Sequence, residues 1–230
     1  VDSTPLPFYR DAPAAADDPA TTGYIRTCQG TRAGDLIHPL YADRIKVAAT
    51  LAEAADAYSA RNYAGALKLY EAARTTPGGE QLRTYTGLYL TNWRLGKRDA
   101  AASAFGKIVD QGLVAKRLGV KFLFRPGTSA LYADPKLPPA PPYSMWIQQI
   151  AANGSLRNAC LEVVGHSSAS GPEPLNERLS LLRAEALKKE IERLQPTLGK
   201  RMLANGVGSR ETLVGNGRDD ASDALDRRVE

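Results

Sequence analysis

One stretch of the chain constrains its fold more than any other, because it specifies a strand, a loop and a long helix in succession. The apolar residues from Cys160 to Val164 are typical of a strand, and Gly165 follows them. A helical pattern then opens at Pro174, a residue suited to a first helical turn, and closes before Pro196. The apolar face of this helix is predicted from Leu175, Leu179, Leu182, Leu187, Ile191 and Leu194.

Shorter patterns surround this unit on both sides. Residues 120–124 alternate as a strand does, and Trp146, Ile147, Ile150 and Ala151 mark one face of a helix. A further strand is predicted from Arg201 to Gly206, a short helix from Ala221 to Arg227 and a last strand at the chain end. Alternating strands and helices of this kind predict a sandwich with the helices on one face of a sheet.

Several spaced motifs in this half of the chain resemble one family. They are Leu161-Glu162-Val163-Val164-Gly165-His166-Ser167-Ser168, Asn176 to Ser180, Arg183-Ala184, Asp226 to Glu230, and the earlier loop from Arg125 to Leu131. In this order they resemble the OmpA-like C-terminal domain, a peptidoglycan-binding module, over residues from about 117 to 230. The departure is Ser168, which stands where the family places an aspartate after glycine, histidine and threonine.

The resemblance implies a ligand and a set of binding residues. The family ligand is the diaminopimelate of a peptidoglycan stem peptide, whose ammonium meets the aspartate and whose carboxylate meets an arginine on the following helix. The matching positions are Ser168 and Arg183, with Ser167, Asn176 and Glu173 around them. A guanidinium offers paired donors to a carboxylate, whereas a serine hydroxyl brings no charge to an ammonium.

Two of these residues also have simpler interpretations. An arginine on an amphipathic helix is usually a solvated side chain, and this alternative stays open for Arg183. Glu173 either supplies the missing carboxylate or is a solvated residue that the helix dipole stabilises.

The pattern is helical from about Ala42 to Leu113, and it repeats. Ala66 and Tyr70 correspond to Ala101 and Phe105 at a period of 35 residues, close to the 34 of tetratricopeptide repeats, which this part resembles. The small residue lets two helices approach, and the aromatic residue four places on fills the gap between hairpins. Two copies are few for a stack, so we expect them to pack on the leader or on the C-terminal domain. We also expect them to bind a protein partner.

The expected fold class is therefore α+β, with N-terminal helical repeat hairpins and a C-terminal OmpA-like sandwich. We expect three parts: a partly flexible leader over residues 1–44, a helical domain over 45–116 and the OmpA-like domain over 117–230. Val1 indicates a processed form or an omitted targeting segment. The C-terminal Glu230 stops in what resembles the start of a strand, so we expect the natural chain to be longer.

Charge and cysteine usage limit the other possibilities. The formal charge is +5 and the isoelectric point is near 9.2, but basic and acidic residues are interspersed, so no nucleic-acid surface is expected. No apolar run approaches the roughly 20 residues of a membrane-spanning helix. Cys28 and Cys160 have no metal-ligand spacing, so neither a metal nor a cofactor is expected. The two either form a disulfide or remain a free Cys28 and a buried Cys160.

A hydrolase is the main enzymatic alternative, because Gly165-His166-Ser167-Ser168-Ala169 is similar to a nucleophile elbow. The last glycine of that motif is missing, a loop separates the serine from the helix, and no histidine follows residue 166. The sequence therefore favours a non-enzymatic protein of the cell envelope, and the resemblance implies the periplasm of a Gram-negative bacterium. The alternative is a protein-interaction scaffold whose OmpA-like domain no longer binds the wall.

Overall fold

The computed structural model describes residues 39–133, 140–218 and 220–230. The chain divides into two compact units, Val1–Lys46 and Val47–Glu230. Of the first unit only the opening of helix α2 (Pro39–Ser59) is described. Most of the predicted leader, including Cys28, lies outside the described residues. The described helices and strands after α2 all belong to the second unit.

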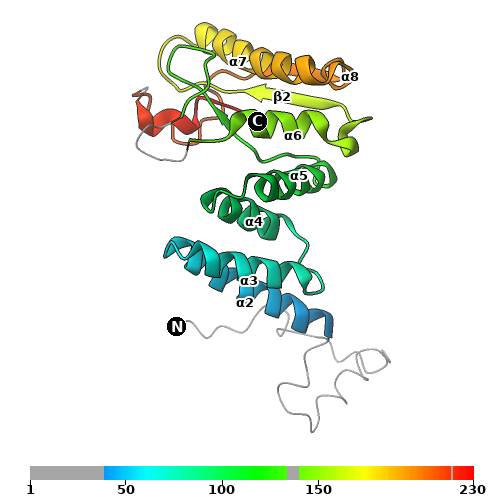
Figure 1. Ribbon diagram of the computed structural model, residues 1–230. Helices are drawn as coiled ribbons and strands as arrows, with labels where there is room; N and C mark the ends of the chain where they lie inside the picture. The colour runs from blue at the N-terminus through cyan, green and yellow to red at the C-terminus, as the bar shows by residue number, and fades with distance from the viewer. Residues whose placement is uncertain (1–38, 134–139, 219) are drawn as a thin grey trace, which may run out of the picture. The chain divides into compact units, whose positions relative to one another are not determined.

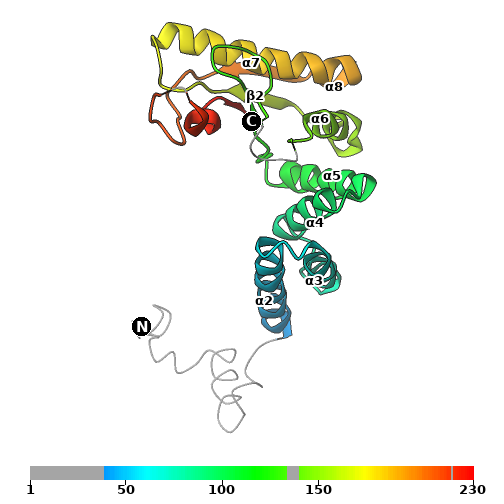
Figure 2. The ribbon, with the colours of Figure 1, turned by 60° about the vertical axis from the view of Figure 1, so that its left-hand side comes forward.

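The first part of this unit is helical, as the sequence predicts. After α2 come α3 (Tyr63–Thr75), α4 (Leu82–Arg94) and α5 (Arg98–Val114). The Oδ1 atom of Asn62 accepts a hydrogen bond from the Gly65 amide at 3.0 Å and so caps α3. Gly78 and Gly96 adopt positive φ angles of 77° and 74° in the turns before and after α4. In both views α4 and α5 lie side by side (Figures 1 and 2).

The two repeated pairs identified in the sequence are all buried. Ala66 and Ala101 are fully enclosed, and Tyr70 and Phe105 are 7% and 1% exposed. Tyr70 packs on Gly87 of α4, where an added Cβ would lie only 2.1 Å from its ring. Phe105 stacks on Trp146 with ring centroids 5.6 Å apart and planes 3° from parallel. Each aromatic residue thus fills the gap to the next element, although membership of the tetratricopeptide family stays a prediction.

The second part of the unit contains a mixed four-stranded sheet. Its strands are β1 (Phe122–Leu123), β2 (Leu161–Gly165), β3 (Met202–Gly206) and β4 (Arg228–Val229), in the order β1-β4-β2-β3. Strands β2 and β3 are parallel, and β4 pairs antiparallel with both β1 and β2. The helical elements are α6 (Tyr143–Ala152), η3 (Gly154–Leu156), α7 (Glu173–Leu194), α8 (Pro196–Gly199) and η4 (Ala221–Leu225). The α+β class is confirmed.

The strand register places α6 and α7 on the same face of the sheet. Val229 lies opposite both Phe122 and Gly165, so the three residues share one face. The ring of Phe122 meets Tyr143 and Trp146 of α6. On the same face, a Cβ on Gly165 would lie 1.9 Å from the carbonyl oxygen of Ser180 in α7. The glycine is therefore required for the close approach of α7 to the end of β2.

The predicted apolar face of α7 is wrong in its first half and at its last residue. In the first half Leu175 and Leu182 are 63% and 43% exposed, and Leu194 at the C-terminal end is 40% exposed. The buried face consists of Asn176, Ser180, Arg183, Ala184, Leu187 and Ile191. The physical reason is that this half of α7 packs on glycines and backbone loops at the strand ends, which offer hydrogen-bonding partners rather than apolar surface.

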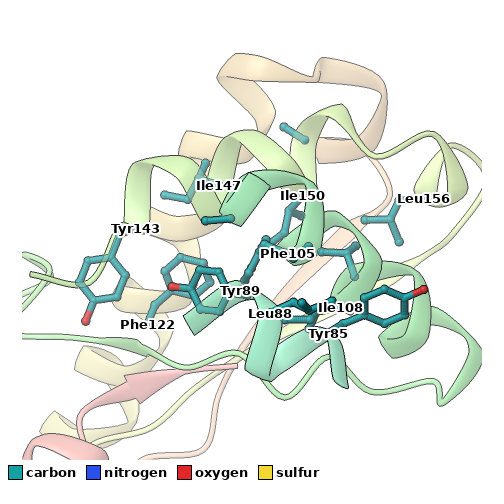
Figure 3. Close-up of a cluster of buried hydrophobic side chains, with 14 of the residues drawn as sticks. Tyr85, Leu88, Tyr89, Phe105, Ile108, Phe122, Tyr143, Ile147, Ile150 and Leu156 are labelled. Carbon is teal, nitrogen blue, oxygen red and sulfur yellow. The ribbon is translucent and has the colours of Figure 1, made fainter. Parts of the chain in front are cut away.

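One hydrophobic core joins the helical part to the sheet part within this unit. Tyr89 and Phe105 pack with Phe122, Tyr143 and the α6 side chains in a single cluster (Figure 3). The Trp146 Nε1 atom donates to the Tyr89 hydroxyl at 2.8 Å, and burial raises the pKa of Tyr89 to about 12. Tyr89 and Phe105 thus pack on the C-terminal part, which is one of the two surfaces on which the repeats are expected to pack. The repeats themselves stay a prediction. The boundary between residues 116 and 117 falls inside this compact unit and stays a prediction.

Candidate functional site

The candidate site is the loop that connects β2 to α7. Its backbone is held by the strands beside it, because the His166 amide donates to the Arg228 carbonyl at 2.8 Å and the Ser167 amide to the Gly208 carbonyl at 2.9 Å. Gly171 has a φ of 83°, which lets the chain turn into α7. The loop is therefore fixed on both sides before any side chain is considered.

Arg183 is buried beneath this loop and is 0% exposed. Its Nη1 donates to the His166 carbonyl at 3.1 Å, its Nε to Thr128 O at 2.9 Å and its Nη2 to Arg125 O at 3.1 Å. The guanidinium also lies 5.7 Å from the centroid of the Phe124 ring. Arg183 is thus not the solvated side chain of the simpler interpretation. It connects the β2–α7 loop to the turn after β1.

The predicted serines lie in the same place and are also buried. Ser167 and Ser168 are 2% and 4% exposed. The Ser168 hydroxyl lies 3.1 Å from the hydroxyl of Ser170. The Asn176 side-chain amide donates to the Gly171 carbonyl at 3.4 Å from the first turns of α7. The fold therefore brings Ser167, Ser168, Asn176 and Arg183 together around one loop.

Glu173 is the first residue of α7, and its carboxylate contacts the segment after β3. Its carboxylate accepts hydrogen bonds from both the amide and the hydroxyl of Ser209, in the segment after β3. The Ser209 hydroxyl bond is the main cause that lowers the pKa of Glu173. Its proposed role as a replacement for the family aspartate stays a prediction.

The C-terminal motif holds the fold around the site, as its arginines suggest. Arg227 is 1% exposed, and its Nε and Nη2 donate to Phe124 O at 3.2 Å and Asp220 O at 2.8 Å. Asp226 accepts amide hydrogen bonds from Val214 at 2.9 Å and Gly215 at 2.7 Å. Asp226 opens the C-terminal motif but was not among the predicted site residues. Its place within the motif, one residue before the two arginines, is the signal that was available.

His166 is a buried imidazole with acids on both sides. Its Nε2 lies 3.4 Å from Glu230 Oε1, and its Nδ1 lies 4.0 Å from Glu211 Oε2. Burial lowers the pKa of His166, and the neighbouring charge of Arg228 lowers it further. His166 is therefore neutral near pH 7, at the point where the chain leaves β2.

The contacts of the β2–α7 loop that hold it in place are hydrogen bonds to the segments around it. A loop of several residues separates Ser167 from α7. In a nucleophile elbow, by contrast, the chain passes from the serine directly into a helix. Within residues 39–133, 140–218 and 220–230, no group of three or more His, Cys, Asp or Glu could hold a metal ion. In the same ranges, no helix is both long and apolar enough to cross a bilayer.

Cys160 differs from the sequence expectation. It lies just before β2 and is exposed, so it is not the small buried residue of one alternative. The disulfide of the other alternative involves Cys28, which lies outside the described residues, and it stays a prediction.

Comparison with known proteins gives a likeness to a solved structure. The chain matches no protein family and no curated protein. Among solved structures it is similar to the peptidoglycan-associated lipoprotein from Burkholderia pseudomallei, with 23% identity over 48% of this chain and 86% of that one. The TM-score is 0.36.

Proposed function

We propose that this chain is a non-enzymatic protein of the cell envelope, whose OmpA-like domain associates with peptidoglycan while its helices hold a protein partner. The proposed location is the periplasm of a Gram-negative bacterium. The spaced motifs of the sequence suggest this function, and the geometry of the site supports it.

The observation that carries the proposal is the hydrogen bond from Arg183 to the His166 carbonyl. Ser168 lies two residues after His166 in the same loop. An arginine on α7 and the position of the family aspartate therefore lie at the same end of the sheet. A diaminopimelate end carries an ammonium and a carboxylate on one carbon, so its recognition needs two such positions close together.

Two features reduce the expected affinity. Ser168 replaces a carboxylate, and charge-assisted hydrogen bonds contribute about 1.5–3 kcal/mol against about 1 kcal/mol for neutral ones. This difference corresponds to a loss of roughly two- to thirtyfold in affinity. In addition, Arg183 donates to Arg125 O, Thr128 O and His166 O, so a ligand carboxylate has to compete with three backbone carbonyls.

The burial of Arg183 favours a second candidate function. A guanidinium that supports two loops from a fully buried position is suited to holding the fold, with or without a ligand. In that case the domain is a scaffold for protein interactions and no longer binds the wall.

The test is a titration of the full chain with a diaminopimelate-containing stem peptide, followed by amide chemical shifts. Native protein is compared with Ser168→Asp, which restores the acid, and with Ser170→Asp, which places the same charge two residues away. A stem peptide with lysine in place of diaminopimelate serves as ligand control, because it lacks the second carboxylate.

The wall-binding proposal predicts weak binding to the native chain, tighter binding to Ser168→Asp and no gain in Ser170→Asp. Shifts should concentrate at residues 166–171. Absence of binding to the native chain at millimolar peptide contradicts the proposal and supports the scaffold. Arg183→Ala is unsuited as a binding probe, because the side chain also supports the fold.

A further inference from the structure

A second surface of the molecule has the character of a binding groove. It is an open hollow of about 640 Å³ between α3 and α4, lined by Tyr70, Gln81, Leu82, Arg83, Thr86, Gly87 and Leu90. This volume lies in the range of about 300–1000 Å³ that is usual for ligand sites. We call this hollow the α3–α4 groove. None of its residues belongs to the loop between β2 and α7.

The floor of the α3–α4 groove is rigid and apolar. Tyr70 is only 7% exposed, and its ring lies directly against Gly87, where no side chain can intervene. On α4, Leu82, Thr86 and Leu90 follow one another at intervals of four residues, so they form one stripe on the helix surface. Leu82 and Leu90 are 48% and 38% exposed. Large aliphatic side chains beside a closed aromatic floor favour an apolar occupant.

The rim of the groove carries a positive charge. Arg83 is exposed and forms no ion pair with any residue that the structure describes. The residues that line the groove include no acid. Glu80, a nearby acid, is engaged with the Tyr85 hydroxyl at 3.0 Å. Arg83 is close enough to Tyr70 to lower the pKa of its hydroxyl, against the larger raising effect of burial. Its charge therefore lies beside the groove, where the lining holds no acid and no described acid forms an ion pair with it.

We propose that the α3–α4 groove binds a peptide segment of a partner protein that presents an aliphatic side chain next to a carboxylate. The aliphatic side chain would pack on Tyr70 between Leu82 and Leu90, and the carboxylate would pair with the Arg83 guanidinium. The Arg83 guanidinium, which pairs with no described acid, repels basic segments. A purely apolar segment would cover this charge without pairing it, so it is also disfavoured. This inference rests on the proposed function only in assuming that the helices bind a protein partner.

The experiment is a selection of random twelve-residue peptides displayed on phage against the full chain, with binding then measured on synthetic peptides by fluorescence anisotropy. Enriched peptides should combine leucine or isoleucine with aspartate or glutamate. Arg83→Glu should weaken them by roughly ten- to a hundredfold, as expected for the loss of a charge-assisted pair. Leu90→Ser should weaken them by about tenfold. Arg178→Glu, the same charge change on an exposed position of α7, should leave binding unchanged.

A charge reversal makes the test specific. Selection against Arg83→Glu should enrich basic residues in place of acidic ones, which a merely structural role for Arg83 would not produce. Failure to enrich peptides, or enriched peptides that bind Arg83→Glu and Leu90→Ser as tightly as the native chain, overturns the inference. A native dimer that Leu90→Ser dissociates also overturns it, in favour of a second copy as the occupant. The stem-peptide titration probes residues 166–171 independently, so either proposal can fail while the other stands.

Discussion

The two ends of the compact unit Val47–Glu230 are stabilised in different ways. The helical end buries apolar and aromatic side chains such as Tyr70 and Phe105. The site end buries polar and charged side chains, above all Arg183, Asp226 and Arg227, each surrounded by backbone hydrogen-bonding groups. Apolar burial tolerates substitutions that conserve side-chain volume, whereas a buried charge is strongly destabilising when one of its partners is lost. The site end should therefore be the more sensitive to single substitutions.

The largest expected effect is from Arg183→Ala. Removing the guanidinium leaves the carbonyls of Arg125, Thr128 and His166 without their buried donor. We expect the free energy of unfolding to fall by about 3–5 kcal/mol in urea denaturation. Arg178→Ala, an exposed arginine on the same helix, should change it by less than about 0.5 kcal/mol. A loss below about 1 kcal/mol for Arg183→Ala would mean that the guanidinium does not hold the two loops.

The helical end can be tested by Gly87→Ala. The added methyl group would meet the Tyr70 ring at 2.1 Å, and we expect a loss of about 1–3 kcal/mol from overpacking. The matched control is Gly106→Ala in α5, where the nearest atom would be Gln149 Oε1 at 3.5 Å. That substitution should gain up to about 1 kcal/mol through helix propensity. Equal effects of the two, measured by thermal unfolding, would contradict the packing described for Tyr70.

The stability of the folded chain should depend on pH through His166. Its folded-state pKa is lowered, so the unfolded chain binds a proton more readily than the folded chain does. Stability is then fully present above the unfolded pKa near 6.5 and is lost as pH falls toward the folded value. The groups that face the imidazole are Glu211, Glu230, Arg228 and Lys121.

We expect the midpoint of thermal unfolding to fall between pH 7.5 and pH 5.5, and His166→Gln to flatten this dependence. The acids with lowered pKa, such as Glu173, lose their contribution only at more acidic pH. If native chain and variant respond identically across this window, His166 is not the group that titrates.

The smallest expected effect is from Leu182→Ala. This leucine belongs to the predicted apolar face of α7 but is 43% exposed, so we expect a loss of less than about 0.5 kcal/mol. Leu187→Ala, on the buried face of the same helix, should cost about 2–5 kcal/mol. Similar costs for the two, measured by chemical denaturation, would restore the sequence-based assignment of that face.

These cases indicate what could be predicted from the sequence and why. The repeated pairs at Ala66 and Ala101 predicted the helical packing, because small and aromatic residues at helical spacing act through local geometry. The strand before Gly165 and the helix after it were predicted for the same reason. Leu187 and Ile191 were predicted on the inward face of α7, but the first half of that face was not, since Asn176, Ser180 and Arg183 are polar residues, and the partners of Arg183 lie in distant segments that periodicity cannot reveal. Only the spaced motifs pointed to that end of the sheet.

The central claim is that the site end associates with peptidoglycan, and co-sedimentation with purified sacculi tests it most directly. The full chain, Ser168→Asp and Ser170→Asp would be incubated with diaminopimelate-containing sacculi and with sacculi that carry lysine in its place. The account predicts a small bound fraction of native chain on the diaminopimelate sacculi alone, and a larger one for Ser168→Asp. Equal binding to both kinds of sacculi, or none for the native chain, would contradict it.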